Sequence, residues 1–298
     1  MINTIDKWLK SSRVLLTGLY LLSGATMKQK SKGAPPLAVG ILMMVILFSF
    51  LTIFIGCSGD KEETIPYYDG WKTYSYKHFI FHYPEGCYWG ERMADFSNAY
   101  ERYLVENCEF LAIEIPVDTI HFYIHNSVED GKKITGRDLP FHTEHQIHWG
   151  RRSPFGLELA RYLIDKMGIR RTDFDFLYDG LAALRDYSNQ NYHHNTIARL
   201  KLGKLIPLDT LIDNQSYARA DTIWRVDESA SLVAFITYNY GINRFKMLWQ
   251  SAASFERSVQ ELFEMDIKSF EQSWLEFAEL NYEGLPGERT VEDTSKTK

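Results

Sequence analysis

Two carboxylates and one arginine in the middle of the chain have spacings that could support acid–base or metal chemistry. Glu158 lies in a segment with helical periodicity, and Arg161 follows three residues later on the same helix face. Asp179 lies in the next predicted helix. Carboxylates from neighbouring helices can act as a general base or as ligands of a divalent cation. The simpler alternative is a surface ion pair between Glu158 and Arg161, worth roughly 0.3 kcal/mol.

The segment 141–149, FHTEHQIHW, is the second candidate because it holds three histidines. A histidine cluster can bind a metal ion. On a strand, however, His145 and His148 would face opposite sides of the sheet. We therefore expect His142, His145 and His148 to be solvent-facing residues of an edge strand, and we predict no metal site.

The remaining polar candidates have weaker patterns. His121 and His125 share one face of a predicted strand over 119–125 and could line a groove, although a solvated face is the simpler expectation. The histidine pair at 193–194 is expected in an exposed, asparagine-rich loop. The chain has no glycine-rich phosphate loop. Three serines have no His or Asp partner in a motif context, so we predict no serine hydrolase: Ser153, Ser229 and Ser231.

Composition and charge limit the classes of function. The chain is 45% hydrophobic and 24% charged, which is typical of a globular protein with a sizeable core. Residues 1–56 hold six basic residues and one acidic residue, a formal charge of +5, whereas the whole chain carries −6. The remainder therefore carries −11. Because phosphate binding needs a basic face, we expect no nucleic-acid partner.

An export signal precedes the folded part. Residues 37–56 are uncharged and apolar, long enough to span a bilayer of ~30 Å, and three lysines lie just before them. The sequence FIGC at 54–57 is similar to a bacterial lipoprotein cleavage box, in which the cysteine becomes the lipid-carrying N-terminus. Phe54 stands where leucine is usual. We expect a lipidated Cys57, with an uncleaved anchor as the alternative, and in both cases the rest of the chain lies outside the cytoplasm.

The order of the predicted elements indicates an α+β fold. Strands are expected within 71–84, at 119–125 and at 145–149, and a polar loop at 126–138. A helix between Cys87 and Cys108 separates these two cysteines too far for a disulfide. The two site helices are predicted at 153–168, capped by Ser153, and from 176 to about 187. Further helices are expected at 227–240, 242–252, 254–264 and 267–280.

This pattern divides the chain into parts. Residues 1–57 form the signal or anchor segment, with Met27 as a plausible true start that would exclude 1–26. Residues 58–70 are a polar tether, and an α+β part follows at 71–190. A helical part at 191–282 ends in a polar tail, 283–298, that we expect to be disordered.

Over about residues 75–280 the chain resembles the gluzincin metallopeptidases, in particular the peptidase MA-like proteins of bacterial lipoproteins. In that family an active-site helix bears H-E-x-x-H, and a second helix with a motif such as E-G-L-A supplies the third zinc ligand. The matching segments here are LELAR at 157–161 and DGLA at 179–182. Three later segments are also similar to the family: IPLDTL at 206–211, SLVAFITYNYG at 231–241 and the closing helix around Trp274.

The resemblance implies a zincin-like mixed sheet followed by an all-helical part, but the zinc chemistry is broken. Leu157 and Arg161 replace the two imidazoles, and neither side chain can ligate zinc. The vestigial positions Leu157, Glu158, Arg161 and Asp179 therefore imply no catalytic residue, no metal and no cofactor. Without the cation, two facing carboxylates would repel each other. We predict that Arg161 bridges Glu158 and Asp179 where zinc would lie.

The expected function is that of a catalytically inactive gluzincin-like lipoprotein of the bacterial cell envelope, periplasmic or surface-exposed. Its partners would be the membrane, through Cys57 or the apolar anchor, and a peptide, protein or glycan ligand held by the cleft. One alternative is an active metal-dependent hydrolase with an atypical site built from Glu158, Asp179 and a histidine of the 142–148 segment. The other is a purely structural lipoprotein.

Overall fold

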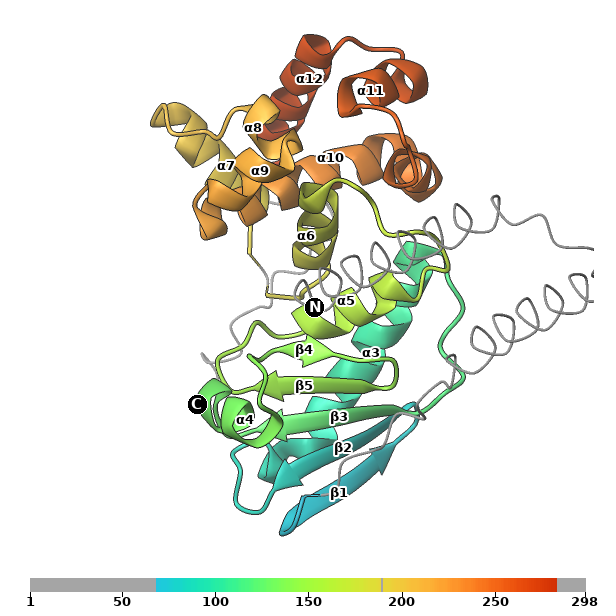
Figure 1. The fold of residues 1–298 in the computed structure, drawn as a ribbon, viewed down its shortest axis with the longest axis vertical. Coiled ribbons are helices and arrows are strands. Elements are labelled where there is room, and N and C mark those ends of the chain that lie inside the picture. Colours follow the sequence, from blue (N-terminus) through green and yellow to red (C-terminus); the bar gives the residue numbers. More distant parts are fainter. Residues whose placement is uncertain (1–67, 189, 283–298) are drawn as a thin grey trace, which may run out of the picture. The chain divides into compact units, whose positions relative to one another are not determined.

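The computed structural model describes residues 68–188 and 190–282. The predicted signal or anchor segment 1–57, with Cys57, most of the tether 58–70 and the tail 283–298 lie outside the described residues. Within the described ranges, no helix combines the length and the hydropathy that a membrane crossing requires. The fold class is α+β, with a mixed sheet followed by a helical part, as predicted (Figure 1).

Five strands form one mixed sheet in the order β1-β2-β3-β5-β4. Strands β2, β3 and β5 are parallel, whereas the outer strands β1 and β4 pair antiparallel with their neighbours. The predicted strand at 145–149 is therefore an inner strand, and the edge belongs to a two-residue strand that the sequence did not indicate. The bounds are β1 (Trp71–Tyr76), β2 (Phe79–Pro84), β3 (Ile120–His125), β4 (Phe141–His142) and β5 (Gln146–Gly150).

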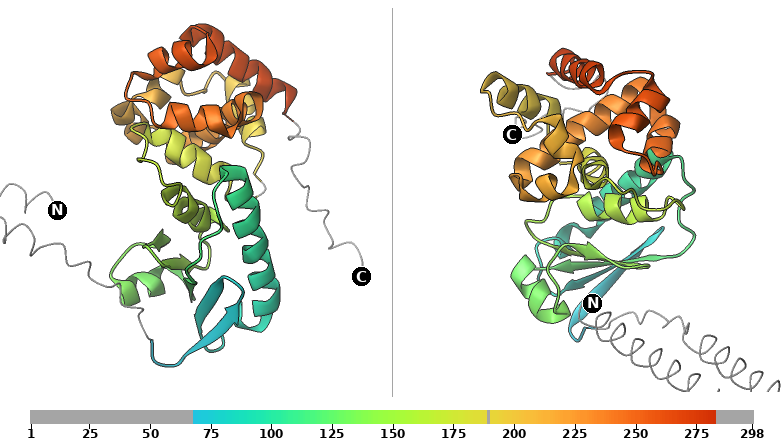
Figure 2. Two further views of the ribbon diagram at one scale, coloured as in Figure 1. Left: turned by 90° about the vertical axis from the view of Figure 1, so that its right-hand side faces the viewer. Right: turned by 45° about the horizontal axis from the view of Figure 1, so that its top comes forward.

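One face of the sheet carries the apolar core. Alternation along the strands places Phe81, Phe122 and Ile147 on this face, and all three are fully buried. Helix α3 (Met93–Leu111) packs there through Phe96 and Tyr100, whose rings contact Phe122. Helix α5 (Leu157–Asp165) belongs to the same core. Figure 2 shows α3 running along the sheet.

On the opposite face of the sheet, the region around the ends of β3 and β5 is covered rather than solvated, which corrects the prediction for two histidines. His125 and His148 are only 1% and 3% exposed. The predicted loop 126–138 contains helix α4 (Val128–Thr135), which Ser127 caps and Gly136 ends. Helix α4 lies against this face, because a Cβ on Gly131 would come within 3.0 Å of the His125 ring.

Four rings form a stack across this face. His82, Tyr123, His148 and Phe141 occupy register-matched positions on β2, β3, β5 and β4. Neighbouring ring centroids are 4.4, 4.5 and 4.5 Å apart, with near-parallel planes. Burial lowers the pKa of His82 to about 4 and that of His148 to about 3. The histidines of this ring stack are therefore neutral at pH 7.

The helical part begins with α6 (Asp175–Leu184) and is centred on the long α10 (Thr222–Trp249), which breaks at Gly241, where φ is 81°. The break matches the predicted separation of two helices. The last two helices, α11 (Phe255–Phe263) and α12 (Ile267–Leu280), also lie where the sequence predicts them, and Asp266 caps α12. Three short helices complete this part: α7 (Tyr192–Lys201), α8 (Leu208–Ile212) and α9 (Asn214–Arg219).

The two cysteines of the described part are unpaired, as the sequence predicts. Cys108 lies within α3 and Cys87 precedes it, and both are buried free thiols. Burial raises the pKa of Cys108 to about 11, which keeps this thiol protonated and unreactive at neutral pH.

Candidate functional site

Helix α5 presents the first residues of the site. The helix begins at Leu157, three residues later than the sequence pattern suggests, and its N-cap is Gly156 rather than Ser153. Gly156 has a φ of 82°, and a Cβ there would lie 2.7 Å from the Asp186 carbonyl oxygen. A glycine therefore fits this turn where other residues would be strained. The first turn then directs Glu158 inward, where it is 4% exposed.

Arg161 lies between the two carboxylates that the sequence singled out. Its Nη1 is 3.4 Å from Glu158 Oε2, and its Nη2 is 3.9 Å from Asp179 Oδ1. This contact pattern agrees with the predicted bridge. The Arg161 side chain is 30% exposed, so the bridge lies at the rim of the structure rather than deep in the core.

His142 is the residue of this site whose predicted environment is wrong. We expected it to face solvent, but its side chain is only 15% exposed and it faces α5. Its Nδ1 is 2.6 Å from Glu158 Oε1, and its Nε2 is 3.0 Å from Asp165 Oδ2. Burial alone would lower the pKa of His142, but hydrogen bonds and charge attraction from Asp165 and Glu158 raise it to about 9. His142 is therefore an imidazolium at neutral pH.

Asp179 is positioned by the packing of α6 on α10. Gly180, the next residue, permits this approach, because a Cβ there would lie 2.5 Å from the Ser229 carbonyl oxygen. The Tyr217 hydroxyl donates to Asp179 Oδ2 over 3.1 Å. Arg225 in turn donates to the Tyr217 carbonyl oxygen over 2.7 Å, which ties α9 to α10. The glycine of the DGLA segment therefore has a packing role.

We call His142, Glu158, Arg161, Asp165 and Asp179 the charge cluster. With His142 protonated, two cations face three carboxylates, which leaves one net negative charge. Both ring nitrogens of His142 are engaged as donors, so neither offers a lone pair to a metal or a proton to accept. Leu157 is apolar and Arg161 is permanently charged. In the described ranges, no group of three or more His, Cys, Asp or Glu side chains is arranged to hold a metal ion.

The histidine pair at 193–194 also differs from its prediction. The pair lies in helix α7, capped by Asn191, rather than in an exposed loop. His193 is 2% exposed, and its Nδ1 lies 3.0 Å from the Ser231 hydroxyl, which also accepts from the Trp274 indole. Because Ser231 is fully buried, this contact joins α7, α10 and α12 in the core and offers substrate no access.

The fold and the cluster define an α+β protein with a charge-compensated site between β4, α5 and α6. No protein-family model, no curated protein and no solved structure matches this chain. The arrangement of its own residues therefore carries the functional argument.

Proposed function

We propose that this chain is an envelope-anchored lipoprotein with a gluzincin-like fold whose zinc position is taken by cationic side chains. It would bind a peptide, protein or glycan without cleaving it. The observation that carries the proposal is the position of the Arg161 guanidinium between Glu158 and Asp179. These three residues lie on α5 and α6. In the gluzincins, which the chain resembles, the two corresponding helices bear the zinc ligands and the general base.

The charges of the cluster support the proposal. A zinc ion would bring two positive charges to this place, and Arg161 with protonated His142 brings the same number. Breaking such a partly buried set of ion pairs would leave carboxylates uncompensated, which is costly. The charges of the site are therefore largely balanced without a metal ion. This is expected of a gluzincin-like protein that has lost the zinc ion and its reactive water.

A second candidate, an atypical hydrolase, has one observation in its favour. His142 and Glu158 form a close pair of 2.6 Å, as a general base and its orienting partner would. The pair has the wrong protonation state for that role, because Asp165 holds the second ring nitrogen and His142 carries two protons. The non-catalytic proposal is therefore the better supported of the two.

A metal-binding experiment tests the proposal. The full chain, in detergent, is incubated with zinc, desalted and analysed for bound metal. We expect far less than one zinc per wild-type chain. The variant Leu157→His/Arg161→His restores two imidazoles at i and i+4 around Glu158, with Asp179 as the third ligand, and should retain about one zinc per chain.

The matched control is Gln272→His/Glu276→His on α12, where the two side chains already contact each other at i and i+4 on an exposed face. It creates the same histidine spacing without a third ligand from a second helix. We expect it to lose zinc on desalting. Stoichiometric zinc in the wild type, with cleavage of peptides that a chelator stops, would overturn the proposal in favour of the hydrolase. A restored variant that binds no better than the control would refute the assignment of positions 157, 161 and 179.

A further inference from the structure

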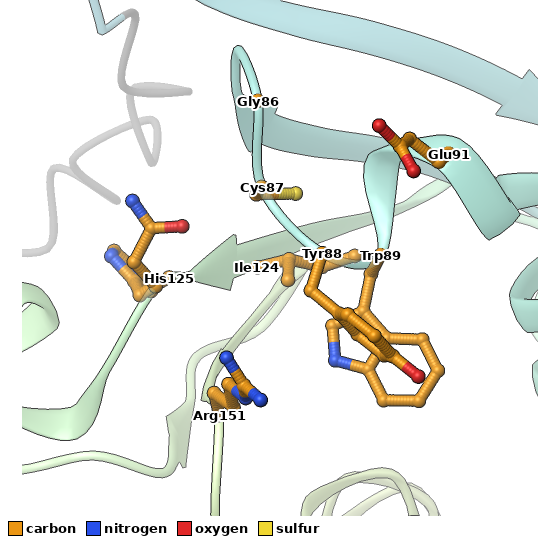
Figure 3. A pocket seen from close by; sticks show the side chains of 9 residues that line it. Gly86, Cys87, Tyr88, Trp89, Glu91, Ile124, His125 and Arg151 are labelled. Atoms are coloured by element: carbon orange, nitrogen blue, oxygen red, sulfur yellow. The ribbon is translucent and has the colours of Figure 1, made fainter.

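A pocket of about 490 Å³ lies at the carboxyl ends of the three parallel strands, away from the charge cluster. Its lining comes from the turn after β2, the end of β3 and the residue after β5, and it shares no residue with the charge cluster. Ligands of open sheets with parallel strands commonly bind at this end, and the volume suits a small organic molecule. Figure 3 shows Tyr88, Trp89, His125 and Arg151 around the same space.

Arg151 is the arginine of the pocket lining, and a second arginine, Arg92, lies near the same tyrosine ring outside the lining. The Arg151 guanidinium lies 5.2 Å from the centroid of the Tyr88 ring, and the Arg92 guanidinium lies 4.9 Å from it. Among the residues that the structure describes, neither arginine forms an ion pair. A guanidinium such as that of Arg151, which has no ion pair within the described ranges, is suited to an oxyanion.

Trp89 also lines the pocket, and its ring nitrogen lies beneath the surface. The indole Nε1 of Trp89 is buried, and no described residue accepts a hydrogen bond from it. Because this nitrogen is buried, the polar side chains that a ligand can reach are the exposed ones of the lining, Arg151, Glu91 and Asn126. Glu91 and Asn126 also line the pocket and can bind hydroxyl groups.

We infer that this pocket binds an acidic sugar, with its carboxylate or phosphate on Arg151, its hydroxyls on Glu91 and Asn126, and its apolar face on Tyr88. The oxyanion pairs with Arg151, and the sugar hydroxyls donate hydrogen bonds to the Glu91 carboxylate in the same lining. The aromatic wall excludes water from the C–H face of the sugar ring. This inference does not depend on the proposed function, because the two sites have no residue in common.

Calorimetry and ligand-observed NMR on the full chain test the inference, in a detergent without a sugar headgroup. The probes are glucuronate, glucose 6-phosphate, glucose and inorganic phosphate. We expect glucuronate or glucose 6-phosphate to bind at least about tenfold more tightly than glucose or phosphate alone, a difference of about 1.4 kcal/mol. Arg151→Gln should weaken the binding of the acidic sugar by about tenfold or more, because it removes the charge but keeps a hydrogen-bond donor.

Arg102→Gln is the matched control, since Arg102 also lies over a tyrosine ring, that of Tyr103 on α3, but outside the pocket. This variant should bind the acidic sugars like the wild type. Equal weakening by both variants would overturn the inference, and so would inorganic phosphate binding as tightly as glucose 6-phosphate. No binding of either acidic sugar up to about 10 mM would also overturn it. Thermal unfolding of each variant shows whether a loss of binding reflects a loss of fold.

Discussion

His142 and His148 lie on paired strands of one sheet, yet the structure holds them in opposite charge states. His142 contacts two carboxylates, which keep it protonated, whereas burial lowers the pKa of His148 and nearby cationic groups lower it further. Position on the sheet therefore does not decide the charge of a histidine here. The groups that face the imidazole from the packed elements decide it. The two sites should respond to pH in opposite directions.

The largest expected effect is loss of stability in mild acid. The pKa values of His148 and His125 are lowered to about 3 and about 4, so the unfolded chain binds more protons than the folded chain below about pH 6.5. Stability is fully present above that pH and falls as the pH drops toward these values. For these two buried rings we expect a loss of about 4 kcal/mol between pH 6.5 and 4.5. Because Glu228, with a pKa raised to about 8, changes stability in the opposite direction over this interval, urea unfolding of wild type and a histidine variant in detergent is compared, and the difference reports the ring.

His148→Phe tests how much of the stability lost in acid comes from His148. It keeps a ring in the stack and removes one titrating group, so its loss should be smaller by about 2 kcal/mol over the same interval. His142→Gln is the control, because His142 stays protonated in both states in this range. An unchanged acid slope in His148→Phe would refute the assignment to the ring stack.

The next largest effect is the alkaline counterpart at His142. Its pKa is raised to about 9, so the folded chain binds more protons than the unfolded chain between about pH 6.5 and 9. The stabilisation is fully present below pH 6.5 and is lost as the pH rises through 9. We expect up to about 3 kcal/mol of loss in the wild type that His142→Gln lacks.

The comparison with the variant matters because another group titrates in the same interval. Burial raises the pKa of Glu228 to about 8, and this carboxyl also makes stability fall as the pH rises. Glu228 is present in both proteins, so the difference between them reports His142. Identical alkaline slopes in wild type and His142→Gln would show that the imidazolium contributes nothing.

A smaller effect is expected from Arg161, the other cation of the charge cluster. Arg161→Met keeps the apolar stem and removes the charge, and we expect a loss of about 1–2 kcal/mol at pH 7, because Glu158 remains paired with His142. The alkaline loss should also move to higher pH, because His142 loses a like-charged neighbour. Arg170→Met, which breaks an exposed pair with Asp173, is the control and should cost no more than about 0.5 kcal/mol. Equal losses would place Arg161 among ordinary surface pairs.

The elements with a clear period were predictable, and the contacts of the site were predictable in part. The apolar alternation of β3 and the faces of α5, α6 and α12 depend on local sequence, so the strands and helices lie near their predicted positions. The relation between Glu158, Arg161 and Asp179 followed from the resemblance and from the chemistry of two facing carboxylates. Helix α4 had a readable signal that was missed, since Ser127 caps it and Gly136 ends it.

The histidine environments could not be read from local sequence. Strand β4 is two residues long, and His142 reaches Glu158 only because β4 pairs with β5 beside α5. The burial of His125 and His148 depends on α4 and on ring contacts across four strands. Such contacts join residues far apart in the chain, where periodicity carries no information.

The smallest expected effect comes from Tyr217, which contacts Asp179, the third carboxylate of the charge cluster. It shows whether Tyr217 and Arg161 together hold Asp179 in place. Tyr217→Phe removes the hydroxyl that donates to Asp179, and we expect a loss of about 1 kcal/mol in urea unfolding at pH 7. Combined with Arg161→Met it forms a double-mutant cycle, because both side chains contact Asp179. If both hold Asp179 in place, the two losses should differ from additivity by about 0.5 kcal/mol or more. Strict additivity would mean that Asp179 keeps its place without Arg161, and the bridge between the helices would then be a contact without energetic weight.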